Sequence, residues 1–241
     1  MKKIAVYIIL VLCFLSCTNA KHANPVAVKT DKTSYHLVHI GTSEIIVDGV
    51  LDKTWRQAIT LTNLSAPWNE NFELQTQFRA VHTDTALYFY FSVQDDDIFL
   101  EQSFENEESN AVRSDRVELF LRHPTNLNPY YSFEMDASGR LFDSKGVFNG
   151  SIDESWNIDR ELLRFETKLS ETGYLVEGVI KKSILKELGL ISEKGTIAVG
   201  VYRGNYHSDS SEIEWISWIK PESEKPKFHI PSSFGTFIFD E

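Results

Sequence analysis

In the stretch ALYFYFSVQD, residues 86–95, purely apolar side chains alternate with side chains that carry a hydroxyl group. Successive side chains of a β-strand point to opposite faces, so a period of two indicates a strand. One face carries the apolar members of the pattern, Leu87, Phe89, Phe91 and Val93. The other face carries Tyr88, Tyr90 and Ser92. The segment therefore predicts a long strand with one face in a hydrophobic core.

The same period recurs along the chain, between turns rich in Asn, Asp, Gly and Pro. The segments are RVELFLRH (116–123), YYSFEMD (130–136), YLVEGVI (174–180), TIAVGVYRG (196–204), EIEWISWI (212–219) and FGTFIF (234–239). The first puts Val117, Leu119 and Leu121 inward and Arg116, Glu118 and Arg122 outward. Many short alternating strands predict an all-β fold, an antiparallel β-sandwich of immunoglobulin or jelly-roll type. Two short helices are expected, at 51–58 and at 181–189, the latter ended by Gly189.

The first residues read as an export signal. Lys2 and Lys3 precede the apolar run 4–15, which ends at Ser16-Cys17. This pattern is typical of a bacterial lipoprotein signal cleaved before an acylated Cys17; an ordinary secretory signal is the alternative. Residues 18–38 are polar and predict a tether, followed by one domain over 39–241. We expect a protein of the cell envelope, anchored by its lipid to the outer membrane and facing the periplasm.

Composition narrows the functional classes. The formal net charge is −11, and about −13 without the signal, so a nucleic-acid partner is not expected. The only cysteines are Cys13 and Cys17, so the domain has neither a disulfide nor a thiol nucleophile. No nucleophile motif or distinct pair of catalytic carboxylates appears. We therefore predict a binding protein and not an enzyme.

Two groups of residues could bind metal or haem. Asp95, Asp96 and Asp97 follow a predicted strand, and clustered carboxylates suit a structural Ca²⁺; a solvated turn is the alternative. His36 and His39 are three residues apart, but they lie near the predicted tether, so we interpret them as solvated side chains. Met135 could ligate haem together with a His or Lys, but it alternates in phase with core residues.

The aromatic residues divide into core and surface candidates. Trp55 fits an apolar pattern, and Trp215 and Trp218 lie in opposite phase, so both cannot face inward. Trp68 and the pair Phe228-His229 lie outside predicted strands, where exposure is expected. Exposed rings can stack on the apolar faces of sugars.

Five segments in the same order resemble the family 9 carbohydrate-binding modules, within a broader group of β-sandwich domains that includes DOMON-type haem and sugar binders. They are IIVDGVLDKTWRQA (45–58), TDTALYFYFSVQDDDI (83–98), SDRVELFL (114–121), GYLVEGVIKKSIL (173–185), and ISWIKP with FHIPSSFGTFIF (216–239). The resemblance implies a site in which two tryptophans hold a terminal sugar beside an arginine. Here Val112 and Phe228 stand at the tryptophan positions, and the arginine position falls near Glu134.

From this resemblance and the loop aromatics we expect a sugar site built from few residues. Phe228 is the expected stacking platform, His229 and Arg113 its hydrogen-bonding neighbours, Glu134 a rim acceptor, and Trp68 a further exposed ring. The prediction is a non-catalytic, oligo- or polysaccharide-binding lipoprotein acting in polysaccharide capture or metabolism. The alternatives are a DOMON-type haem or redox module that uses Met135, and an envelope assembly protein.

Overall fold

The computed structural model describes residues 32–73, 75–208 and 212–241. Cys17 and the predicted signal lie outside these residues, as does the tether up to residue 31. The described part contains twelve strands and two short α-helices, so the all-β prediction is confirmed. No helix within it has the length and apolar character needed to cross a membrane.

The strands have the following bounds: β1 Ser34–His39, β2 Thr76–His82, β3 Ala86–Gln94, β4 Arg116–Arg122, β5 Tyr130–Asp136, β6 Leu141–Gly146, β7 Ile152–Asp153, β8 Leu163–Ser170, β9 Gly173–Lys181, β10 Thr196–Tyr206, β11 Ile213–Ser217 and β12 Gly235–Phe239. The helices are α1 Glu107–Ala111 and α2 Lys182–Glu187, and the 3-10 turns are η1 Thr54–Gln57 and η2 Pro231–Ser233.

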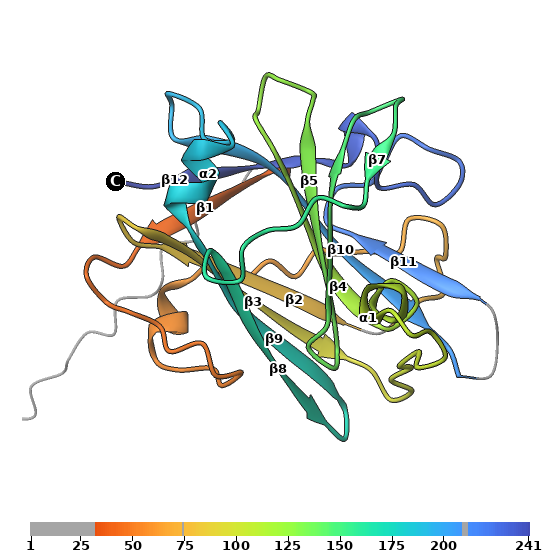
Figure 1. Cartoon of the computed structure of the whole chain (residues 1–241). Helices are drawn as coiled ribbons and strands as arrows, with labels where there is room; N and C mark the ends of the chain where they lie inside the picture. The colour runs from red at the N-terminus through yellow and green to blue at the C-terminus, as the bar shows by residue number, and fades with distance from the viewer. Residues whose placement is uncertain (1–31, 74, 209–211) are drawn as a thin grey trace, which may run out of the picture.

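All strands of the described chain join in one curled sheet (Figure 1). Its order is β7-β6-β5-β4-β10-β12-β1-β2-β3-β9-β8, with β11 paired to β10 beyond this path. The expected pair of separate antiparallel sheets is therefore not what forms. The sheet is continuous because β1 pairs with both β12 and β2, and it runs parallel to each.

The β1 strand also corrects the predicted tether. The polar composition of 18–38 predicts a tether, but residues 34–38 form most of a strand whose Tyr35 and Leu37 are fully buried. The ordered fold thus starts at Ser34 at the latest, and not at residue 39.

The main hydrophobic core lies where the two halves of the curled sheet face each other. The half built on β4, β5 and β10 contributes Val117, Leu119, Leu121, Tyr131, Phe133, Met135, Val199 and Val201. The half built on β3 and β9 contributes Leu87, Phe89, Phe91, Val93, Tyr174, Val176 and Ile180. The alternation predicted for these strands is confirmed, and Met135 is a fully buried core residue.

A second aromatic layer covers the opposite face of β4, β5 and β10. It consists of Phe120, Tyr130, Phe148, Tyr202 and Phe228, with Trp68, Trp215 and Phe234 packed against it. Three of these rings, Trp215, Phe228 and Phe234, come from the segment 215–234, called here the closing loop. Trp218 belongs to the main core and Trp215 to this layer, as their opposite phase predicts. The outward face of β4 is consequently buried along its whole length.

Both expected helices form, although they are short. The 51–58 segment makes only the 3-10 turn η1, which buries Trp55 completely. Helix α2 ends before Gly189, whose φ of 64° is the left-handed conformation that glycine adopts without strain. Helix α1 was not predicted; the Asn106 side chain accepts a hydrogen bond from the Glu108 N–H and starts it.

Candidate functional site

Two adjoining cavities lie on the outer face of β4 and β5, beside the closing loop. They share Arg116, Glu134, Ile152 and His229. The Trp215 cavity, of about 310 Å³, is completed by Glu118, Trp215, Pro226, Lys227 and Phe228. The Arg113 cavity, of about 350 Å³, extends toward α1. Volumes of this size are at the lower end of those that hold small ligands in proteins.

Arg116 is the central cation of this site. It lies two residues before Glu118 on the same face of β4, and the strand register places Glu134 of β5 directly opposite Glu118. The Arg116 Nε donates to Glu134 Oε2 at 2.8 Å and lies 2.9 Å from Glu118 Oε1. Its guanidinium also donates to the Val112 carbonyl at 2.8 Å. The two carboxyl groups and the one guanidinium are thus held in fixed positions.

Glu118 is the least satisfied group in this cluster. It is almost fully buried, and its Oε1 has an ionic contact with Arg116 but no hydrogen-bond donor. Burial, and then the charge of Glu134, raise its pKa to about 8, although Arg116 opposes this shift. Buried polar atoms without partners are rare in folded proteins. Glu118 lines the Trp215 cavity beside Arg116 and Glu134, so this carboxyl group is a candidate acceptor for a ligand hydroxyl.

Aromatic rings form the other wall of the Trp215 cavity. Trp215 is half-buried on β11, with the Arg116 guanidinium 5.4 Å from its ring centre. Phe228 stacks on Tyr202, with ring centres 4.1 Å apart and planes inclined by 7°, and meets Trp215 edge-on at 5.6 Å. Phe228 is only 5% exposed. The expectation that it is an exposed platform is wrong, because the closing loop folds its ring into the aromatic layer.

His229 and Trp68 hold this wall in place. The His229 Nδ1 lies 2.8 Å from the Tyr130 hydroxyl, and its ring packs on Phe120. Burial lowers the pKa of His229, which favours its neutral form. Trp68 donates from Nε1 to the Ser223 carbonyl at 3.0 Å and contacts Phe228. Trp68 is half-buried and lines neither cavity, so it contacts Phe228 from outside the cavity walls.

The structure brings four of the five predicted sugar-site residues to these cavities. Glu134 and His229 line both, Phe228 lines the Trp215 cavity, and Arg113 lines the Arg113 cavity. Arg113 is exposed at the end of α1, where it donates to the Ser109 carbonyl at 2.8 Å and lies over the Phe104 ring. These four residues therefore lie close together as expected, while the contacts that they make differ from the expectation and a sugar site here stays a prediction.

The aspartates predicted to bind calcium have protein partners. Asp95 is buried and pairs with Arg203 at 2.9 Å, and its other oxygen accepts from the Asp97 N–H. Asp97 binds the side chain and the N–H of Ser208. In the described parts of the chain no three His, Cys, Asp or Glu residues are grouped to hold a metal ion. A calcium ion here stays a prediction that melting with and without a chelator would test.

Sequence reasoning missed Arg116, Glu118 and Trp215. The strand pattern places Arg116 and Glu118 on the outer face of their strand, which is correct, but alternation alone does not indicate that other residues cover this face. One signal could have found them: a charged i, i+2 pair on the same face as Phe120 is unusual for an open surface. The opposite phases of Trp215 and Trp218 show that one of them faces outward, but they do not indicate a cavity on that side of the sheet.

Comparison with known proteins identifies the class of this domain. Residues 47–241 match the family described as carbohydrate family 9 binding domain-like, and the chain belongs to that family. Two relatives are endo-1,4-β-xylanase C of Paenibacillus barcinonensis, 30% identical over 135 residues, and endo-1,4-β-xylanase A of Thermotoga neapolitana, 25% identical over 193 residues. These alignments cover 56% and 79% of this chain but only 11% and 16% of the xylanases.

Solved structures share the fold. A crystal structure of a candidate carbohydrate-binding protein from Bacteroides uniformis has a TM-score of 0.67 at 18% identity, over 86% of this chain and 99% of the other. A family 9 carbohydrate-binding module from Caldicellulosiruptor kristjanssonii, solved with glucose, has a TM-score of 0.58 at 18% identity, over 86% and 95%. The same organism's module with cellotriose gives 0.59 at 17%, over 86% and 93%.

Proposed function

We propose that this protein is a non-catalytic carbohydrate-binding protein that holds a sugar in the Trp215 cavity. The observation that carries the proposal is a cavity that is lined both by the Arg116, Glu118 and Glu134 cluster and by the half-buried ring of Trp215. A sugar offers hydroxyl donors at its rim and apolar C–H faces, so it complements both walls at once. Family membership supports the same ligand class.

The charges of the cavity favour a neutral sugar. Two acids, Glu118 and Glu134, and two cations, Arg116 and Lys227, line the cavity, so its charges balance when all four groups are ionised. A carboxylate or sulfate on a sugar would add an uncompensated charge to this balanced site, where a low dielectric makes an unpaired charge costly. Hydroxyl groups can instead donate to the two acids and accept from the arginine.

The cellular part of the proposal comes from the sequence. We propose that Cys17 carries a lipid that anchors the domain in the bacterial outer membrane, where it takes part in polysaccharide capture or metabolism. The xylanases that match this chain, and the modules solved with glucose and cellotriose, make β-1,4-linked glucans and xylans the first ligands to test.

Trp215→Ala tests the site against a matched control. Calorimetric titration with glucose, cellotriose and xylotriose should show binding that weakens about tenfold in Trp215→Ala, because a stacked ring contributes on the order of 1 kcal/mol or more. Trp68→Ala is the control, since Trp68 also contacts Phe228 but lines neither cavity. Equal losses in both variants, or no binding of any neutral oligosaccharide by folded protein, would count against the proposal.

A further inference from the structure

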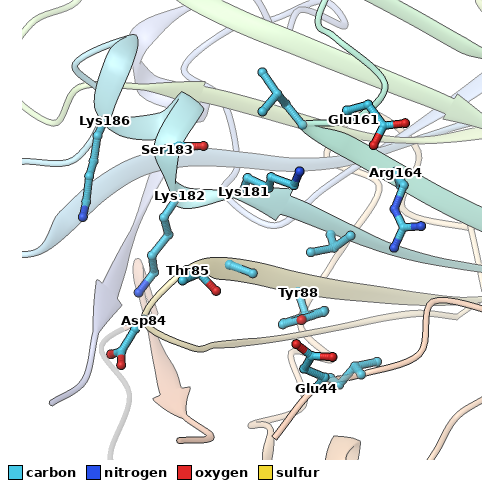
Figure 2. A pocket seen from close by; sticks show the side chains of 14 residues that line it. Glu44, Asp84, Thr85, Tyr88, Glu161, Arg164, Lys181, Lys182, Ser183 and Lys186 are labelled. Carbon is cyan, nitrogen blue, oxygen red and sulfur yellow. The ribbon is translucent and has the colours of Figure 1, made fainter. Parts of the chain in front are cut away.

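A larger cavity lies on a different part of the molecule, on the outer face of the β3–β9–β8 half of the sheet (Figure 2). Its volume is about 700 Å³. The walls come from β3, the end of β9, the start of α2, the segment before β8, and residues 44–45. We call it the lysine cavity, because Lys181, Lys182 and Lys186 line it together with Arg164.

The register of three strands explains why these side chains share one space. Tyr88 of β3 lies opposite Val179 of β9, and Val179 lies opposite Arg164 of β8. Lys181 follows Val179 by two positions and so points to the same face. Figure 2 shows the Lys181 and Arg164 side chains extending into one region, with Tyr88 and Glu44 on the other wall. Tyr88 and Val179 thus form a partly apolar floor beneath the cationic groups of Lys181 and Arg164.

The four cations of this cavity form no ion pairs within the described residues. Among the residues that the structure describes, none of the four has a carboxylate oxygen within 4.0 Å. The acids that line the cavity are Glu44, Asp84 and Glu161, so the cations are in excess by one. The chain as a whole carries a net charge of −11. A local excess of unpaired cations in so acidic a protein favours an anionic ligand.

The position of the lysines makes their repulsion costly. Lys182 and Lys186 are four residues apart on α2, where like charges destabilise a helix. The Lys182 Nζ lies 2.8 Å from His82 Nδ1 and 4.7 Å from the centre of the Phe239 ring. Burial lowers the pKa of Lys182 to about 8; Asp84 opposes this shift and the charge of Lys186 adds to it. Lys182 and Lys186 thus add positive charge to the cavity wall beside Lys181.

We propose that the lysine cavity is a second saccharide contact, which takes the oxyanion of an acidic sugar between Lys181 and Arg164. The oxyanion is a carboxylate or a sulfate ester, and the sugar ring lies on the floor formed by Tyr88 and Val179. This second proposal depends on the proposed function in one respect, which is that the ligand is a saccharide. Its residues are separate from those of the Trp215 cavity, which favours neutral sugars.

An anionic membrane surface is the less favoured ligand for these cations. The cations lie in a hollow that also contains Glu44, Asp84 and Glu161, whereas a flat membrane is contacted by projecting basic side chains without acids among them. The negative charge of the rest of the chain would also oppose approach to anionic lipid. A sugar carboxylate on a flexible chain can enter a hollow that a bilayer cannot.

The test uses the full chain carrying Cys17→Ala, so that a lipid anchor does not interfere. Titration calorimetry measures binding of pentagalacturonate, of a sulfated galactan pentamer and of cellopentaose, and sedimentation measures binding to phosphatidylglycerol vesicles. The double variant Arg164→Gln/Lys181→Gln should bind the acidic oligosaccharides about tenfold more weakly. The control Lys168→Gln/Lys225→Gln removes the same charge from exposed positions outside the cavity and should bind like the parent.

The outcomes separate this proposal from the first one. Binding of one or both acidic oligosaccharides that falls with salt, and is lost in the cavity variant but not in Trp215→Ala, supports the lysine cavity and identifies the oxyanion. Equal weakening in the cavity variant and its charge-matched control would overturn it, as would absence of acidic saccharide binding. Binding to vesicles alone would replace the saccharide with a lipid headgroup. Failure of cellopentaose to bind would count against the Trp215 cavity as a sugar site and would leave the lysine cavity proposal unchanged.

Discussion

Replacing Glu118 by glutamine should change how the stability of this protein depends on pH. The substitution keeps the shape of the side chain but removes its ionisation. Glu118 has a pKa of about 8 in the folded protein, because burial and the charge of Glu134 outweigh the attraction of Arg116. In the unfolded chain the same group ionises near 4.5. Folding therefore favours the protonated acid.

The sign and size of the effect follow from linkage. A carboxyl group whose pKa is raised by folding contributes stability that is fully present below pH 4.5 and is lost as the pH rises to about 8. At about 1.36 kcal/mol for each pH unit, ionisation of Glu118 costs the folded state on the order of 5 kcal/mol by the end of this window. Glu118→Gln removes this loss, so the variant should gain stability relative to the parent as the pH rises.

Urea unfolding followed by tryptophan fluorescence at pH 5, 6, 7, 8 and 9 measures the difference directly. Asp115 also titrates in this range, since burial raises its pKa to about 7, but it contributes equally to parent and variant. Glu134→Gln is the matched control. It removes the charge that raises the Glu118 pKa, so stability should be lost over a narrower window that ends at lower pH.

One result would refute the reasoning. If the difference in free energy of unfolding between Glu118→Gln and the parent is the same at pH 5 and pH 9, Glu118 does not change protonation in the folded state. The carboxyl group would then be ionised throughout and satisfied by Arg116. The view that burial and Glu134 outweigh Arg116 at this carboxyl group would then be wrong.

Three other substitutions test separate parts of the structure. Phe228→Ala should cost about 3–5 kcal/mol of stability by chemical denaturation, because the ring is buried against Tyr202; a cost below about 1 kcal/mol would show that it is exposed after all. Gly200→Ala should cost roughly 1–3 kcal/mol, since its Cβ would lie 2.1 Å from the Tyr202 hydroxyl and displace that ring; an unchanged midpoint would contradict the packing. Cys17→Ala should move the protein from the membrane to the soluble fraction, and a parent that is already soluble would disprove the lipid anchor.

The alternation of side chains predicts the strands and their inward faces because it is a local property of the chain. Val117 and Phe89 are buried where the pattern placed them. Local pattern cannot say what covers the other face. Arg116 and Glu118 look like solvated residues until the closing loop, about a hundred positions later, folds across them. The same loop buries Phe228, which looks exposed because it lies outside any strand. The strand β1 escaped prediction because its two buried residues, Tyr35 and Leu37, are too few to establish a period.

The central position of β1 affects how the domain should be divided from the rest of the chain. The family match begins at residue 47, yet β1 ends at His39 and joins β12 to β2. A fragment cut at the start of that match would leave β12 and β2 with unpaired edges in the middle of the sheet. It would also lose the Tyr35 hydroxyl, which accepts from the Ala80 N–H in the core. Open edges of this kind recruit other chains, so such a fragment would be prone to aggregate even though every residue of the recognised family domain is present.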